Sequence, residues 1–243
     1  MLPDPHQGSG LMTLSFSLVA WSAWSPGLAS TEQWRQWHQD GSLGDESAPD
    51  LSWVPLAQRR RLSSLTRIQL ACAQQVLADD SLPVIFATHH GELHRTFQLL
   101  TELGQDEPLS PTHFSLSVHN AAAGLLSILR QDQAPANVVV GGDDCLVLGL
   151  LEAAALLGSG TDELVLVVGD QAVPEPYLVF QQGQQRDHAL ALRIKAGNQV
   201  TLTSGQGGCA APWPLAMQLA GLLAAGASGP LQLTDREWQW QQV

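Results

Sequence analysis

The chain has 243 residues, of which 44% are apolar and only 14% charged, and it carries a net charge of −12 at pH 7. This length allows one large domain or two small ones with a sizeable core, and the apolar content indicates a folded rather than a disordered chain. The acidic balance argues against nucleic-acid binding, against binding to anionic membranes, and against unaided docking of an acidic protein. So few charges are typical of a surface that a partner covers, although a low-charge monomer fits them equally well.

The N-terminal segment is expected to begin with a flexible leader, residues 1–12, in which Met12 offers an alternative start. The apolar stretch that follows is similar to a secretory signal peptide, but no basic residue precedes it and Asp4 does. We therefore interpret residues 14–21 as the first strand of the domain. No apolar run reaches the roughly 18 residues needed to cross a bilayer, so no membrane span is expected.

Three widely spaced cysteines form neither a metal-binding pattern nor a disulfide framework: Cys72, Cys145 and Cys209. This usage favours a reducing compartment and a cytoplasmic location.

Strands and helices alternate along the rest of the chain. We expect helices at 31–38, 59–79, 92–103, 111–130, 145–158 and 214–226, and further strands at 84–90, 137–140, 163–170, 176–180, 188–196, 199–205 and 231–243. This order implies an α/β domain with a mostly parallel, mixed sheet covered by helices on both faces. With no internal repeat, residues 13–243 are expected to form a single domain.

The most informative stretch is a strand, a glycine turn and an apolar helix at residues 137–158, with Asp143, Asp144 and Cys145 at the start of the helix. It lacks the features of a P-loop and of a dinucleotide fingerprint. A metal site on the adjacent carboxylates and a thiolate nucleophile at Cys145 are the alternatives. We favour an aspartate that caps the helix N-terminus, worth about 1 kcal/mol, and a buried structural cysteine.

Other polar clusters have competing interpretations. His90 and His94 have the spacing of a zinc pair, next to His89, but a solvated junction between strand and helix is the favoured alternative. His119 and Asn120 lie among small residues, a pattern typical first of close helix packing. Two tryptophan pairs are expected to be core and edge anchors: Trp21 with Trp24, and Trp34 with Trp37.

Three stretches together resemble the N-terminal half of the β-ketoacyl-acyl-carrier-protein synthases, which have the thiolase fold: residues 18–41, 110–128 and 134–157. The resemblance covers roughly residues 12–170 and implies a thiolase-like domain truncated in its C-terminal half. In this register Asp143 occupies the position of the nucleophilic cysteine. After Asp143 the only histidine is His188, so both catalytic histidine motifs are absent. The resemblance therefore implies a catalytically inactive relative that needs neither cofactor nor metal.

A ketosynthase-like chain without a nucleophile resembles the chain-length-factor class, and the short form resembles those of aryl polyene biosynthesis. This implies a heterodimer or heterotetramer with a full-length ketosynthase in type II fatty-acid or polyketide-like biosynthesis, with acyl carrier protein contacted only through that partner. By position, Asn137, Val138, Val139 and Val140 would form the strand that pairs across the dimer.

The same resemblance implies that the helix after Pro111 reaches the partner's acyl tunnel. His113, Leu116 and Asn120 are expected on one face of it, with Phe114 beside them, as tunnel-lining or dimer residues. The alternative is that they pack within this subunit. Two other functions stay open: a stand-alone acyl-transfer enzyme that uses Cys145, and a homodimeric acyl-binding or scaffold protein.

Overall fold

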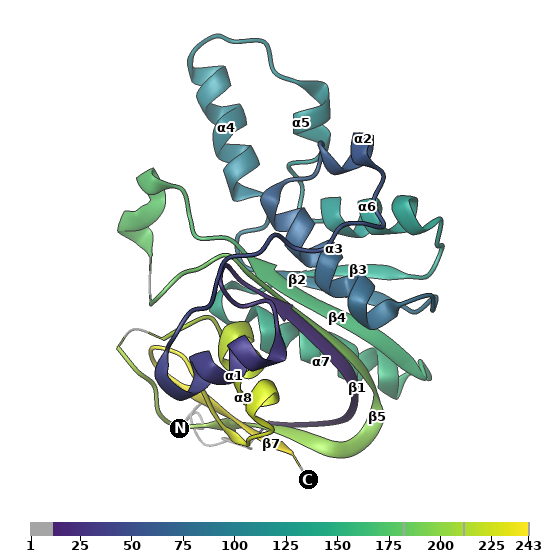
Figure 1. Ribbon diagram of the computed structural model, residues 1–243, viewed down its shortest axis with the longest axis vertical. Coiled ribbons are helices and arrows are strands. Elements are labelled where there is room, and N and C mark those ends of the chain that lie inside the picture. Colours follow the sequence, from purple (N-terminus) through teal and green to yellow (C-terminus); the bar gives the residue numbers. More distant parts are fainter. Residues whose placement is uncertain (1–11, 182, 211, 243) are drawn as a thin grey trace, which may run out of the picture.

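A single mixed sheet with helices on both faces organises the chain (Figure 1). The computed structural model describes residues 12–181, 183–210 and 212–242, so all of the expected leader 1–12 except Met12 lies outside the described residues. The elements in chain order are β1 (Thr13–Trp24), α1 (Thr31–Asp40), α2 (Leu56–Arg59), α3 (Ser64–Leu77), β2 (Val84–Thr88), α4 (Leu93–Gly104), α5 (Pro111–Ser115), α6 (Ala121–Arg130), β3 (Ala136–Val140), the 3-10 helix η1 (Gly142–Asp144), α7 (Cys145–Gly158), β4 (Glu163–Asp170), the 3-10 helix η2 (Glu175–Phe180), β5 (His188–Gly205), α8 (Leu215–Ala225), β6 (Gly229–Gln232) and β7 (Glu237–Gln242).

The sheet has seven strands in the order β3-β2-β4-β5-β7-β6, and β1 pairs with β5 off this path. β2 pairs in parallel with both β3 and β4, whereas every other ladder, including β4 with β5 and β1 with β5, is antiparallel. The predicted mixed sheet covered by helices is confirmed. Its parallel part is smaller than predicted, because it is confined to three strands.

Alternate residues of the central strands build two hydrophobic cores. Ile85 and Leu166 face the helices α7, α8 and α1, while Phe86 and Val167 face α3 and α6. Both faces of β2 and β4 are therefore buried, which explains why their sequences are continuous apolar runs rather than alternating ones.

Short-range signals for helix ends are confirmed. Ser30 and Gln33 form a capping box at the start of α1, and Gly226 ends α8 in the left-handed conformation. The helix predicted from residue 59 begins later, at Ser64, because Ser63 caps it by accepting a hydrogen bond from the Thr66 N–H over 3.0 Å. Trp34 and Trp37 pack edge to face in the core, as expected.

The predicted helix at 111–130 is wrong, because the chain leaves the helical path between α5 and α6. The Ser115 hydroxyl donates to the Thr112 carbonyl, and the Ser117 hydroxyl donates to the Phe114 carbonyl. Such short hydroxyl groups compete with the helical hydrogen bonds of the backbone. His113, Leu116 and Asn120 consequently do not share one face of a continuous helix.

Three strand predictions in the second half are also wrong in detail. The expected strand at 176–180 is η2, where Pro174 and Pro176 cannot donate ladder hydrogen bonds. The two strands expected at 188–205 are one continuous strand, β5. The C-terminal strand is a β6–β7 hairpin, closed where the Leu233 N–H donates to the Arg236 carbonyl over 2.8 Å.

Among the described helices, none combines the length and the apolar character that a membrane span requires.

Candidate functional site

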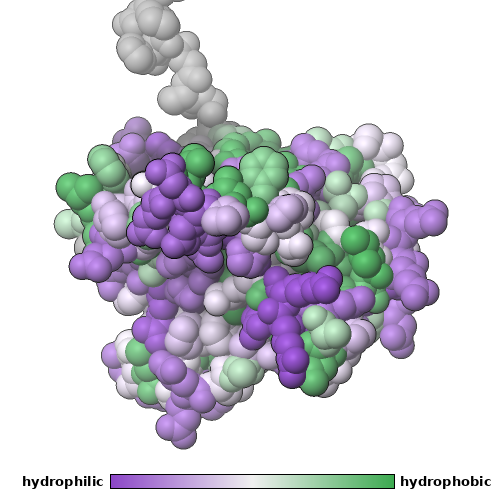
Figure 2. All heavy atoms as spheres, turned by 90° about the horizontal axis from the view of Figure 1, so that it is seen from above, coloured by the Kyte–Doolittle hydropathy of each residue, from purple (hydrophilic) through white to green (hydrophobic). Residues whose placement is uncertain are grey.

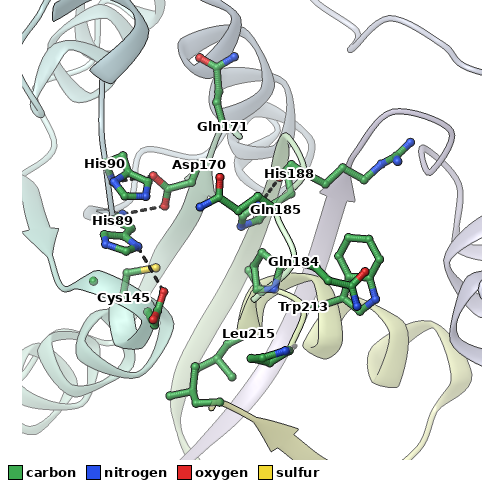
Figure 3. A pocket seen from close by; sticks show the side chains of 17 residues that line it. His89, His90, Cys145, Asp170, Gln171, Gln184, Gln185, His188, Trp213 and Leu215 are labelled. Carbon is green, nitrogen blue, oxygen red and sulfur yellow. Dashed lines mark hydrogen bonds and ion pairs between the residues drawn. The ribbon is translucent and has the colours of Figure 1, made fainter. Parts of the chain in front are cut away.

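The candidate site lies where the parallel strands β2, β3 and β4 end. His89 and His90 follow β2, Asp170 ends β4, and the turn Gly141–Asp144 follows β3. Figure 3 shows the two imidazole rings beside the Asp170 carboxylate, with the Cys145 sulfur nearby. Ligand sites of open α/β sheets lie at this position, outside the carboxyl ends of parallel strands.

Asp170 fixes the backbone that carries both histidines. Its Oδ2 accepts a hydrogen bond from the His89 N–H over 2.7 Å, and its Oδ1 accepts from the His90 N–H over 2.9 Å. The Thr88 hydroxyl also donates to Oδ1, over 2.8 Å. The side chain is 6% exposed, so these donors are what stabilises its charge in the interior.

His89 connects this network to the turn after β3. Its ring stacks on His90 with 3.7 Å between the ring centroids, and its Nδ1 lies 3.4 Å from Oδ1 of Asp143. The hydrogen bond with Asp143 raises the pKa of His89, and the same contact lowers the pKa of Asp143. Burial, followed by the charge of His89, lowers the pKa of His90. The two rings are therefore biased toward opposite protonation states.

The turn itself depends on its two glycines. Gly142 has a φ of +57°, and a Cβ on Gly141 would lie 3.2 Å from the Cα of Cys145. Neither aspartate caps the helix through its side chain, contrary to the favoured interpretation. Asp143 turns to His89 instead, and Asp144 forms an ion pair with Arg236 of the β6–β7 turn. The turn is thereby tied to two separate parts of the fold.

Cys145 lies behind the turn and is buried in the core. Burial, reinforced by the charge of Asp170, raises the pKa of its thiol well above the usual value. A buried thiol of this kind is a poor nucleophile at neutral pH, which weighs against the acyl-transfer alternative.

Two hollows adjoin the cluster formed by His89, His90, Asp143 and Asp170. The smaller is a cavity of about 60 Å³ whose other lining residues include Arg186, His188 and Trp213. The larger is a groove of about 530 Å³ against η2. His89, His90 and Asp143 line both of them.

The predicted tunnel residues lie away from this cluster, around α5. Phe114 is 67% exposed, Leu116 is half-buried and Asn120 is exposed. His113 lines a separate polar pocket of about 400 Å³ together with Arg60, Arg61, His94 and Arg95. Of the four, His113 alone lines one of these hollows of the described chain, and the tunnel role of all four stays a prediction.

Basic side chains gather near that pocket although the chain as a whole is acidic. The arginines of this segment are also tied together: Arg67 donates to the Arg59 carbonyl and Arg95 donates to the Arg61 carbonyl. The arginines near this pocket and the negative net charge of the chain show that the charge is unevenly distributed over the molecule. Figure 2, a view from above that of Figure 1, shows apolar side chains among strongly hydrophilic ones on that face.

Asn137–Val140, the predicted dimer strand, lies in β3 at the edge of the sheet, and within the described residues β3 pairs only with β2. Val140 is 50% exposed, and Ile128 of the neighbouring helix α6 is exposed as well. An apolar edge strand of this kind is a template for pairing with another chain.

Sequence reasoning missed the convergence of Asp170, His89 and Asp143. Each lies directly after, or at the end of, a predicted strand of the parallel part of the sheet. The rule that the carboxyl ends of parallel strands meet at one edge would have brought them together. In the part of the chain that the structure describes, no group of three His, Cys, Asp or Glu side chains is placed to hold a metal ion.

Comparisons with known proteins agree on one family. Residues 34–241 match the family model for the N-terminal domain of β-ketoacyl synthases. The match extends well beyond residue 170, where the resemblance recognised in the sequence ended. A chain of the complex between the ketosynthase ApeO and its chain length factor ApeC from Xenorhabdus doucetiae superimposes with a TM-score of 0.86 at 26% identity, over 94% of this chain and 100% of that one.

Two further structures share the fold. They are the ishigamide ketosynthase/chain length factor (TM-score 0.60, 16% identity, 88% of this chain and 74% of that one) and a β-ketoacyl synthase from Burkholderia phymatum STM815 (TM-score 0.58, 10% identity, 88% and 71%). No curated protein matches the sequence significantly.

Proposed function

The chain belongs to the family of β-ketoacyl synthase N-terminal domains, and from this premise we propose that it is a non-catalytic, chain-length-factor-like subunit. It pairs with an active β-ketoacyl-acyl-carrier-protein synthase and bounds the acyl tunnel of that enzyme, in biosynthesis of the aryl polyene type. The observation that carries the proposal is the match over the full length of a chain from a ketosynthase–chain length factor complex.

The chemistry of the turn after β3 supports a role without catalysis of condensation. Asp143 stands where the family register places the nucleophile, and a carboxylate is a far weaker nucleophile toward a thioester than a thiolate. Cys145, the nearest thiol, is buried with a raised pKa. The partner would therefore supply the reactive cysteine.

The surface supports a protein partner. Among the described residues β3 has a strand partner on one side only, and exposed apolar side chains occur on β3, on α6 and in the α4–α5 segment. Members of this group are Leu100, Leu103, Phe114, Val118, Ile128 and Val140. Burying such side chains contributes roughly 25 cal/mol per Å² of apolar area, which suits a stable interface. A second copy of the chain could use the same edge, which is the homodimer alternative.

The contact with acyl carrier protein is proposed to be indirect, through the ketosynthase, because the chain carries a net charge of −12. The exposed Arg60 and Arg61 form a local basic surface on this acidic chain. Binding of acyl carrier protein to the isolated subunit, which the proposal expects to be absent, is therefore a direct test.

The test is co-expression with a full-length ketosynthase of the aryl polyene type, with an affinity tag on this chain alone. Captured material is analysed by size-exclusion chromatography with light scattering. A stoichiometric complex of equal numbers of both subunits is expected. A homodimer that captures no ketosynthase would support the scaffold alternative, and a well-behaved monomer would contradict both.

A further inference from the structure

The groove against η2 has both apolar and polar lining residues. Leu93, Tyr177 and Phe180 supply apolar and aromatic surface, and His89 and Asp143 supply polar groups. Tyr177 is held in place by an edge-to-face contact with Phe97, at 5.7 Å between ring centroids. A space of about 530 Å³ of this composition accommodates a small apolar ligand beside an imidazole.

We propose that His89, oriented by Asp143, is a general base that hydrolyses neutral, apolar thioesters bound in this groove. The chain stays non-catalytic in condensation; the choice of thioesters rests on the proposed function, whereas the hydrolytic step itself does not need the partner. It uses no nucleophile of the protein, because the attacking group is water.

Three contacts hold the imidazole of His89. The backbone N–H is fixed by Asp170 over 2.7 Å, one ring face stacks on His90, and Nδ1 lies 3.4 Å from Asp143. A carboxylate at Nδ1 favours the tautomer with the proton on that nitrogen, so that Nε2 is the proton acceptor. His89 lines the groove, and its Nε2 lies next to Gly142, where a glycine adds no side chain: a Cβ there would come within 3.9 Å of Nε2. Asp143 is a positioning residue in this arrangement.

The reaction balances without any further reagent. Water transfers a proton to Nε2 of His89 as its oxygen bonds to the thioester carbonyl carbon. The tetrahedral intermediate then collapses with cleavage of the C–S bond, and the imidazolium returns the proton to the departing sulfur. The products are a carboxylic acid and a free thiol. General-base assistance of this kind is worth about 10²- to 10⁴-fold in rate.

The charges around the groove select the substrate class. His89 faces His90 on its own loop, Asp143 on η1 and Asp170 on β4. Arg236 of the β6–β7 turn also acts on Asp143 but is ion-paired with Asp144, so carboxylates outnumber cations around His89. The hydrogen bond with Asp143 raises the pKa of His89, which makes its imidazole a stronger proton acceptor. Negative surroundings disfavour substrates that carry phosphate or carboxylate groups near the reacting carbonyl. The expected substrates are therefore uncharged acyl or aryl thioesters.

The experiment measures thiol release from S-octanoyl-N-acetylcysteamine by the purified full-length chain. We expect hydrolysis above the buffer rate, a loss of at least about tenfold in His89→Gln, and no change in the control His38→Gln, an exposed histidine on α1. Asp143→Asn should move the midpoint of the pH–rate profile to lower pH, because His89 loses the contact that raises its pKa. A merely structural role of Asp143 would not shift this midpoint.

Each outcome decides the proposal. No hydrolysis above buffer by the unaltered chain, or equal rates for His89→Gln and His38→Gln, would overturn it. If circular dichroism shows that His89→Gln is unfolded, His89→Asn and the Asp143→Asn profile take its place, and an unshifted profile overturns the proposal. Capture of the ketosynthase is scored separately on the same variants, so failure of the hydrolytic activity is distinguishable from failure of the partner role.

Discussion

The Asp170 carboxylate at the end of β4 accepts a hydrogen bond from the His89 N–H, 81 residues away in sequence, over 2.7 Å. Removing this buried acceptor leaves backbone donors unpaired. Asp170→Ala should therefore lower the free energy of unfolding by about 2–3 kcal/mol, measured by urea titration. Asp162→Ala, an exposed aspartate before β4, is the control and should cost almost nothing. Equal losses in both variants would show that this bond contributes little.

The His89–Asp143 pair should make stability depend on pH in a defined window. The raised pKa of His89 gives stability that is present below about pH 6.5 and lost as pH rises through its folded-state pKa. The lowered pKa of Asp143 gives stability that is present above about pH 4 and lost as pH falls through its folded-state pKa. The free energy of unfolding of the unaltered chain should therefore exceed that of Asp143→Ala most between about pH 4 and 6.5. The difference should be less than about 1 kcal/mol, because the pair is half-exposed.

That small difference is read from thermal melting across the pH range, with Asp162→Ala as the reference. A difference between the chain and Asp143→Ala that is flat from acid to alkaline pH would mean that the pair does not titrate as described. In an assembled ketosynthase complex, Asp143→Ala should leave condensation unchanged. A large loss of turnover there would show that Asp143 takes part in the partner's reaction.

Val140→Lys should weaken assembly with the ketosynthase without affecting the folding of this chain. Placing an ammonium group on the open edge at β3 disfavours pairing with another strand, while the half-exposed site tolerates it in the monomer. We expect at least a tenfold loss of captured ketosynthase without a change in melting temperature. Val19→Lys, at a similarly exposed valine of β1, is the matched control. Full capture by Val140→Lys would move the interface away from β3.

Leu116→Trp should shorten the longest product of the assembled complex if this side chain bounds the tunnel. Leu116 is half-buried at the end of α5, so an indole there extends outward with little disturbance of the core. Product lengths are compared by mass spectrometry with those of Leu56→Trp, an exposed leucine of α2. An unchanged distribution would remove Leu116 from the tunnel.

Iodoacetamide should modify the native chain first at Cys209, which is the most exposed of the three free cysteines. Burial raises the pKa of Cys72 to about 12 and that of Cys145 well above its usual value, so both should react only after denaturation. Mass spectrometry of the digested protein locates the label. Rapid native labelling of Cys145 at neutral pH would restore the acyl-transfer alternative.

Local signals in the sequence were sufficient for much of the fold. The Ser30 cap, the apolar run of β4 and the Gly226 stop each act within a few residues, and the structure has all three. The break between α5 and α6 was not predictable from apolar spacing, because hydroxyl groups such as that of Ser117 decide it. The hairpin of β6 and β7 depends on a short turn that propensity alone does not separate from one strand.

The site was harder to predict than the fold, because its contacts join distant segments. Asp143 was singled out as a residue of the turn, but its contact with His89, on the loop after β2, was not predicted. Arg236, which pairs with Asp144, comes from the C-terminal hairpin. These segments are neighbours because of the order of the strands in the sheet, and the strand order cannot be read from the sequence alone.

β5 runs for 18 residues and pairs with β1, β4 and β7. Through its antiparallel ladder with β4, this strand joins the parallel strands β2, β3 and β4 to the antiparallel rest of the sheet, and the two parts cannot separate while β5 keeps its ladders. The chain should accordingly melt in a single transition, with the slowest-exchanging amides in β5. Severing the chain within this strand should yield two fragments that fold only when mixed.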